Sequence, residues 1–281
     1  MLPVVPAVIL MQTMTPSFKD IPYAVVDGKR LLLDLYLPEA VSDPCLVVWL
    51  HGGAWQFGSK NDVRTDLIKA GYAMASVDFR QAGEGVFPAQ VHDIKAAIRF
   101  LRAHAGDYGY RPDRIALWGA SSGGHLAALV GVTRGNEILE GKVGDDPDED
   151  AGVQAVIDFY GPTNLLTILE QSTPHGLGVR VPALTLLLGG SMSDAAVRDL
   201  ARLASPVFHV DKNAPPLLMM HGVQDNQVPV NQSLELQGAY AARGLDVQLE
   251  LVQGAGHMDE VYYQPAAMEI VAGFLSRVLN D

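Results

Sequence analysis

One serine, set between a short apolar run and a helix-like stretch, places the strongest constraint on how this chain can fold. Ser121 lies in the segment 119–124, whose other members are glycines, an alanine and a second serine. The apolar run 115–118 before it predicts a strand, and residues 125–132 after it predict a helix. Small residues let the backbone turn sharply between the two elements and approach its neighbours closely. Such a strand–turn–helix arrangement presents the serine hydroxyl as a nucleophile requires.

Strands alternate with helices along most of the chain. Residues 46–50 form a continuous apolar run, which is typical of a strand buried on both faces of a sheet. Residues 88–105 carry an apolar stripe at helical spacing, which predicts a helix. This alternation predicts an α/β fold, with a mostly parallel twisted sheet flanked by helices. The other expected strands are two within 21–38 that meet at the turn Asp27-Gly28, then 72–79, 153–160, 217–220 and 247–252, and the other expected helices are 61–70, 231–243 and a last one near the C-terminus.

A single α/β domain is expected to occupy residues 1–281. The length and the hydrophobic content of 48% suffice for one large core. Residues 163–205 lie between two expected strands and are more numerous than one crossover needs. We therefore expect a small insertion over the site, termed the cap segment, whose leucines suit either an apolar acyl pocket or the core. Residues 1–14 are apolar without a basic residue, and we expect them to form an arm packed on the domain.

The charge and the single cysteine narrow the choice of partners and compartment. A formal net charge of −12 argues against a nucleic-acid partner, because phosphate binding needs a basic surface. Cys45 is the only cysteine, so no intramolecular disulfide can form, and we expect this thiol to be buried. These features favour a cytoplasmic location, and secretion through an atypical leader stays open. No uninterrupted apolar run approaches about 18 residues, so no membrane span is expected.

A serine nucleophile needs a base and a group that orients the base. In open α/β sheets such groups lie on loops at the carboxyl ends of strands. Asp225 and His257 each follow an expected strand closely. We therefore expect a catalytic triad in which His257 takes the proton of Ser121 and Asp225 orients the imidazole. The alternative acids are Asp158 and Asp259.

An oxyanion that develops during catalysis needs preorganised N–H donors. A glycine pair just after the strand 46–50 allows a turn whose amides point into the cleft. The expected donors are the backbone N–H groups of Gly53, Ala54 and Ser122. His221 is expected to support the loop of the catalytic aspartate. The sequence contains no metal-binding or nucleotide-binding motif, so neither a metal nor an organic cofactor is expected.

With these residues in place, the chain resembles α/β-hydrolases of the lipase/esterase branch that carry an HGG-type oxyanion motif. It is similar to hormone-sensitive-lipase-like esterases and, more closely, to the feruloyl and acetyl xylan esterase group. The resemblance covers nearly the whole chain from about Tyr23. Ala54 stands where many relatives have a third glycine, and its methyl group is expected to narrow the acyl side. The matching motifs are 33–38, 51–55 with 58–60, 119–124, 160–163, 205–206, 221–222 with 225, and 256–257.

The resemblance implies a serine carboxylic ester hydrolase that acts on short-chain acyl or aryl esters through an acyl-enzyme. The expected partners are small ester substrates of acetyl or feruloyl type; acylated fragments of plant polysaccharides and a homodimer stay open. An arylformamidase or an acyl-peptidase-like amide hydrolase would use the same residues. A non-catalytic binding protein on this fold is the remaining alternative, and the complete set of candidate residues argues against it.

Overall fold

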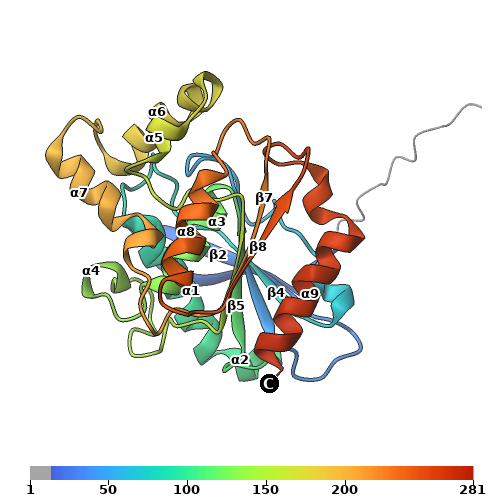
Figure 1. The fold of residues 1–281 in the computed structure, drawn as a ribbon. Helices are drawn as coiled ribbons and strands as arrows, with labels where there is room; N and C mark the ends of the chain where they lie inside the picture. The colour runs from blue at the N-terminus through green and yellow to red at the C-terminus, as the bar shows by residue number, and fades with distance from the viewer. Residues whose placement is uncertain (1–13, 281) are drawn as a thin grey trace, which may run out of the picture.

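A sheet of eight strands forms the centre of the molecule, with helices on both of its faces (Figure 1). The computed structural model describes residues 14–280. The strands are β1 (Phe18–Val26), β2 (Lys29–Tyr36), β3 (Leu46–Leu50), β4 (Ala73–Val77), β5 (Ile115–Ala120), β6 (Ala155–Phe159), β7 (Leu217–Gly222) and β8 (Val247–Val252). Their order is β1-β2-β4-β3-β5-β6-β7-β8. β2 runs antiparallel to β1 and β4, and the other neighbours are parallel. The predicted α/β architecture is confirmed.

The helices alternate with the strands. They are α1 (Ala89–Ala103), α2 (Ala105–Tyr108), α3 (Ser122–Val132), α4 (Glu137–Glu140), α5 (Ile168–Gln171), α6 (Pro174–Leu188), α7 (Ala195–Leu203), α8 (Asn231–Ala241) and α9 (Pro265–Leu279), with short 3₁₀ helices η1 (Asp66–Ala70), η2 (Pro206–Phe208) and η3 (Glu260–Tyr263). The prediction of a helix over 61–70 is wrong in its first half, because only η1 is helical there. Asp62 and Ser59 instead close a separate turn through two mutual hydrogen bonds of 2.9 and 2.8 Å. That turn occupies backbone groups that a longer helix would use.

The sheet separates two hydrophobic clusters. In β3, Leu46, Val48 and Leu50 belong to one cluster, whereas Val47 and Trp49 belong to the other. Successive side chains of a strand point to opposite faces, so a strand covered on both sides is apolar at every position. Residues of α1, α3 and α8 contribute to the first cluster, and residues of α9 contribute to the second. The helices therefore cover both faces and leave the loops at the strand ends to carry the polar side chains.

The cap segment, 163–205, contains α5, α6 and α7. These helices lie together beside the sheet, at the upper left of Figure 1. Thr173 caps α6, because its hydroxyl accepts from the N–H of Gly176 at 3.1 Å. The burial of its apolar side chains favours core packing over an open pocket, and the function of the segment as a cap stays a prediction. The buried side chains of the segment are Leu165, Ile168, Leu184, Leu187 and Leu188, among others.

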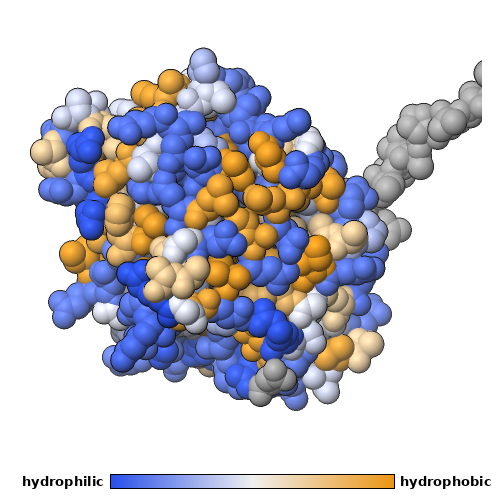
Figure 2. Space-filling model, viewed as in Figure 1, coloured by the Kyte–Doolittle hydropathy of each residue, from blue (hydrophilic) through white to orange (hydrophobic). Residues whose placement is uncertain are grey.

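The sheet ends at β8, whose side chains are mostly half-buried. Figure 2 shows hydrophobic side chains gathered over this strand on the face in view. Leu251 of β8 is among the exposed large hydrophobic residues. An edge strand offers unpaired backbone groups to another chain, and the homodimer stays a prediction.

Three further expectations concern the cysteine, the N-terminal arm and a membrane-spanning helix. The thiol of Cys45 is buried, as predicted. Residues 1–13 of the expected N-terminal arm lie outside the described residues. Between residues 14 and 280, no helix combines the length and the apolar character of a membrane-spanning helix.

Candidate active site

Ser121 occupies a sharp turn between β5 and α3. Its backbone has φ 54° and ψ −121°, a conformation that residues other than glycine rarely adopt. A Cβ at Gly119 would lie 2.2 Å from the carbonyl oxygen of Gly123, and a Cβ at Gly123 would lie 2.1 Å from that of Leu50. Close backbone approach on both sides of the serine therefore requires the two glycines of the motif.

Two hydrogen bonds join Ser121, His257 and Asp225. Ser121 Oγ lies 2.9 Å from His257 Nε2, and His257 Nδ1 lies 2.6 Å from Asp225 Oδ2. The three side chains come from the loops after β5, β8 and β7, at the carboxyl edge of these parallel strands. Because an ionised carboxylate only accepts hydrogen bonds, Nδ1 donates to Asp225 and Nε2 is left to accept from the serine hydroxyl.

The carboxylate of Asp225 is buried among several donors. Oδ1 accepts from the backbone N–H groups of Gln227 and Val228, at 2.8 and 2.9 Å. Oδ2 accepts from His257 and lies 3.4 Å from Nε2 of His221. Burial by itself would raise the pKa of Asp225, but the hydrogen bonds from His221 and His257 hold the pKa well below its usual range. The carboxylate is therefore ionised at neutral pH.

The imidazole of His257 is enclosed and neutral. Burial lowers its pKa below the usual value of 6.5, although the hydrogen bond to Asp225 opposes that effect. The ring of Tyr160 packs edge-on against the imidazole, with 4.9 Å between the ring centroids. Since Nε2 is unprotonated at pH 7 and faces the hydroxyl of Ser121, this imidazole can accept the hydroxyl proton.

The amides expected to stabilise an oxyanion come from two elements near Ser121. Ser122 begins α3, so its N–H is one of the first-turn amides that have no partner within the helix. Gly53 and Ala54 lie in a tight loop after β3, with φ of 118° and 55°. This loop packs on the end of β5, because a Cβ at Gly52 would lie 3.1 Å from the last carbonyl oxygen of that strand.

Trp55 and His125 hold this loop against α3. Trp55 Nε1 donates to His125 Nδ1 at 3.1 Å, and His125 Nε2 donates to the carbonyl oxygen of Ala204 at 2.7 Å. Complete burial lowers the pKa of His125 to about 4, so its ring stays neutral. His125 therefore links the loop of Gly53 and Ala54, α3 and the end of the cap segment.

The two alternative acids are engaged elsewhere. Asp158 Oδ1 accepts from the N–H of Gly161 at 2.8 Å, and burial raises the pKa of this carboxyl to about 7. Asp259 accepts from the N–H of Val261 and thereby caps η3. The carboxylate that contacts His257 is that of Asp225. Among residues 14–280, no three His, Cys, Asp or Glu side chains are arranged to hold a metal ion.

Arg180, a residue of α6, was not expected at the site from the sequence. It is 1% exposed, and its guanidinium carbon lies 5.9 Å from the ring centre of Trp55. A signal was present, because Arg180 is the only Lys, Arg, Asp or Glu between Glu170 and Asp194. A single charge within an apolar helical stretch indicates a charge that the fold buries, and buried charges of this type are rare unless they are paired.

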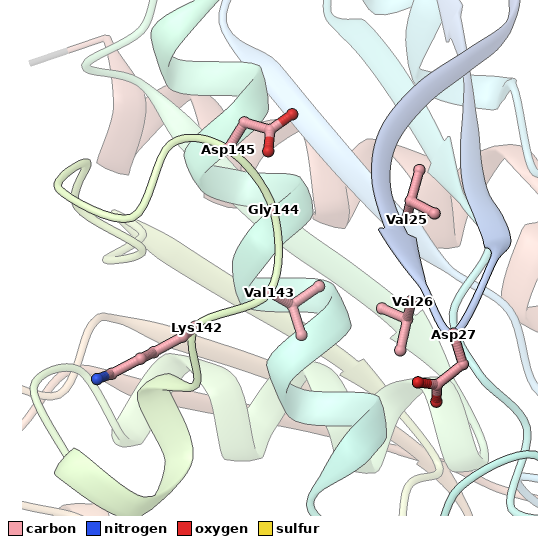
Figure 3. A pocket seen from close by; sticks show the side chains of 7 residues that line it. All are labelled: Val25, Val26, Asp27, Lys142, Val143, Gly144 and Asp145. Atoms are coloured by element: carbon pink, nitrogen blue, oxygen red, sulfur yellow. The ribbon is translucent and has the colours of Figure 1, made fainter.

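A surface hollow of about 430 Å³ lies away from these residues (Figure 3). The end of β1 and the following turn, 25–27, form one wall, and the loop 142–145 forms the other. Three strands, β2, β4 and β3, separate β1 from β5 in the sheet. The hollow carries the side chains of Asp27, Lys142 and Asp145 and none of the residues around Ser121.

Known proteins are similar to this chain over most of its length. A family model described as BD-FAE matches residues 33–240. Esterase LipC of Mycobacterium tuberculosis is 31% identical over 245 residues, which cover 83% of this chain and 58% of LipC. Esterase LipQ of the same organism is 29% identical, with coverage of 80% and 53%. A solved structure described as a truncated form of a carbohydrate esterase from gut microbiota has a TM-score of 0.84 and 29% identity, covering 96% of this chain and 99% of that chain. This chain spans about half the length of the curated relatives it matches.

Proposed function

Because this chain belongs to the BD-FAE family and has the α/β-hydrolase fold, we propose that it is a serine carboxylic ester hydrolase. The observation that carries the proposal is the pair of hydrogen bonds through Ser121, His257 and Asp225. In this proposal Ser121 is the nucleophile, His257 is the general base and acid, and Asp225 orients the imidazole. The esterase names of the relatives support the same reaction class.

The proposed reaction has two halves. As Ser121 Oγ attacks the ester carbonyl carbon, its proton passes to Nε2 of His257. The carbonyl oxygen gains negative charge, which the amides of Gly53, Ala54 and Ser122 stabilise. His257 then donates the proton to the leaving alcohol, and an acyl-enzyme remains on Ser121. A water molecule that His257 deprotonates then attacks the acyl carbon. His257 returns the proton to Ser121 Oγ as the bond between Oγ and the acyl carbon breaks, which releases the acid.

The proposed substrates are esters of short-chain or aryl acids, of acetyl and feruloyl type. The carbohydrate esterase among the similar structures supports esters on sugars. The proposal extends to acylated fragments of plant polysaccharides. The loop of Gly53 and Ala54 supports small acyl groups, because the methyl group of Ala54 occupies space that a third glycine would leave open.

Hydrolysis of p-nitrophenyl acetate, methyl ferulate and N-formylkynurenine tests this proposal. We expect turnover of the esters, and a kcat lowered by about 10³-fold or more in Ser121→Ala. Ser42→Ala, at an exposed position before β3, is the control and should retain the native kcat. Turnover of N-formylkynurenine alone would show that the protein is an amide hydrolase instead.

Covalent labelling separates an enzyme from a non-catalytic binding protein. A fluorophosphonate reacts with an activated serine, so we expect one label on Ser121 of the native protein and none on Ser121→Ala. A native protein that neither turns over an ester nor takes up the label would rule out the proposed function.

A further inference from the structure

Arg180 is a buried cation without a carboxylate partner. Its residue is 1% exposed, and its Nε and Nη1 have no hydrogen-bond partner among residues 14–280. Three other buried cations of the described chain do have partners: Lys60 lies 2.8 Å from Asp34, and Lys95 and Arg99 lie 2.7 and 3.6 Å from Glu140. An unpaired charge in such surroundings destabilises a fold, so its presence calls for a partner outside the described chain.

The guanidinium keeps its charge at neutral pH. Burial lowers the pKa of Arg180 to about 10, and the negative charge of Asp225 opposes this effect. Asp225 does not hydrogen-bond to Nε or Nη1 of Arg180. Its carboxylate oxygens instead contact His257, His221 and the N–H groups of Gln227 and Val228. The negative charge of Asp225 thus acts on Arg180 from a distance, but Nε and Nη1 of the guanidinium have no hydrogen-bond partner between residues 14 and 280.

α6 holds this charge between two loops of the candidate active site. At its start, Thr173 Oγ1 donates to the carbonyl oxygen of Asn226 at 2.7 Å, next to Asp225. At the middle of the helix, the guanidinium lies over the ring of Trp55, which directly follows Ala54. The charge of Arg180 also contributes to the lowered pKa of His257. Arg180 thus lies against the proposed oxyanion loop, on a helix whose start is hydrogen-bonded to the loop of Asp225.

We propose that Arg180 binds a carboxylate of the substrate, so that the preferred esters carry a negative charge close to the scissile bond. The planar guanidinium matches a carboxylate through two parallel N–H···O bonds, which Nε with Nη2, or Nη1 with Nη2, can donate. The chain as a whole has a net charge of −12, so a local cation offsets the repulsion of an anionic substrate. This inference rests on the proposed ester hydrolysis and names the class of its substrate.

The carboxylate can belong to either half of the ester. On the acyl side, the substrate is a monoester of a dicarboxylic acid. On the alcohol side, it is an acylated sugar acid. Both present the same anion to Arg180, and two pairs of substrates separate them: mono-p-nitrophenyl glutarate against p-nitrophenyl valerate, and acetylated methyl glucuronide against acetylated methyl glucoside.

The first measurement is the ratio of kcat/KM for the anionic over the neutral member of each pair. We expect the native ratio to exceed that of Arg180→Met by at least about tenfold in one of the pairs. Arg180→Lys should restore part of the ratio, because it restores the charge without the planar fork. Arg202→Met is the matched control. Arg202 belongs to the same cap segment and also lies over an aromatic ring, that of Phe208, but Arg202 is exposed. A change below tenfold in both pairs overturns the inference.

The second measurement does not depend on turnover. Glutarate at millimolar concentration should raise the Tm of the native protein and of Ser121→Ala, but not that of Arg180→Met, because only the first two retain the guanidinium. A Tm of native protein that glutarate and glucuronate both leave unchanged contradicts a carboxylate site. Should Arg180→Met fail to fold, Arg180→Gln takes its place in both measurements.

The two proposals fail in different ways. If p-nitrophenyl valerate is hydrolysed, and Ser121→Ala abolishes that hydrolysis, the ester hydrolase stands whatever the ratio shows. If the neutral ester is hydrolysed and the ratio does not move, only the role of Arg180 is wrong.

Discussion

The hydroxyl of Ser121 is positioned by its own backbone. A φ of 54° costs free energy for a residue with a Cβ, on the order of 1–3 kcal/mol in comparable cases. The turn is retained because β5 ends and α3 begins on either side of it, each wholly buried. In the proposed reaction the proton passes from Ser121 to His257, and the protonation states of His257 and Asp225 depend on the groups that surround them.

Substitution of Asp225 and of Asp158 tests which of these two carboxylates orients the imidazole of His257. Asp225→Asn should lower kcat by about 10³- to 10⁴-fold, because an amide at this position no longer selects the tautomer of His257 that accepts from Ser121. Asp158→Asn should stay within about threefold of native kcat, since the hydrogen bond of Asp158 goes to Gly161. The measurement is kcat on p-nitrophenyl acetate. Equal losses in the two variants would reassign the acid.

The pH profile reports on the imidazole of His257. Its pKa is lowered by burial, and the neutral form is the proposed base. Activity is therefore present above this pKa and is lost as the pH falls through it. We expect kcat/KM, measured from pH 4 to 8, to decline with a midpoint below 6.5. A midpoint above 7, or a flat profile, would contradict the assignment.

At the scale of elements, α3 packs unusually close to the sheet. All of its residues are buried, and its glycines face neighbouring backbone or strand side chains. A Cβ at Gly124 would lie 2.1 Å from Asp158 Oδ1, and one at Gly131 would lie 2.4 Å from Val156 Cγ2. Glycine weakens a helix by about 1 kcal/mol relative to alanine, so packing against the neighbouring elements, not helix propensity, accounts for glycine at these positions.

A pair of glycine variants separates packing from helix propensity. Gly123→Ala places a methyl group against the backbone of Leu50, just before the proposed oxyanion loop of Gly53 and Ala54. We expect a loss of about 10²-fold in kcat from the displaced loop, together with a lower Tm. Gly273→Ala, in α9, meets no atom within 4 Å. It should raise the free energy of unfolding by about 0.5–1 kcal/mol at native kcat, as urea unfolding would measure. A native kcat in Gly123→Ala would contradict the close approach.

At the scale of the molecule, buried histidines and carboxyls set how stability depends on pH, and they act in opposite directions. His125 has its pKa lowered from 6.5 to about 4, so its contribution to stability is present above pH 6.5 and is lost as the pH falls toward 4. Asp158 has its pKa raised from 3.8 to about 7, so its contribution grows as the pH falls. The two effects partly cancel in the total.

A comparison with a variant isolates the histidine. His125→Gln no longer titrates, so the difference in free energy of unfolding between native and variant should shrink between pH 7 and pH 4. The expected decrease is up to about 3 kcal/mol, from the gap between the two pKa values. Urea unfolding at pH 7, 5.5 and 4.5 measures it. A difference that stays constant with pH would show that the ring is not buried in its neutral form.

Short-range patterns account for what the sequence by itself determined. The order of strands and helices, the apolar runs of β3 and β5, and the glycines around Ser121 follow from residues within one element of each other. The sequence pattern did not predict where η1 begins, because the turn before it is closed by two hydrogen bonds between Ser59 and Asp62. The candidates Asp225 and His257 followed from the rule that polar residues collect at strand ends, but so did Asp158.

Only the tertiary structure decided among these candidates, because the deciding contacts join residues that are remote in the chain. Ser121 and His257 meet across 136 positions, and the pKa of each buried group depends on neighbours from several elements. The surroundings of Arg180 likewise depend on residues that are remote in the chain. The sequence shows one isolated charge in an apolar stretch. Only the packed fold determines that it lies beside Trp55 and that its Nε and Nη1 have no hydrogen-bond partner between residues 14 and 280. Solvation and pairing of a charge are properties of the folded neighbourhood rather than of local sequence.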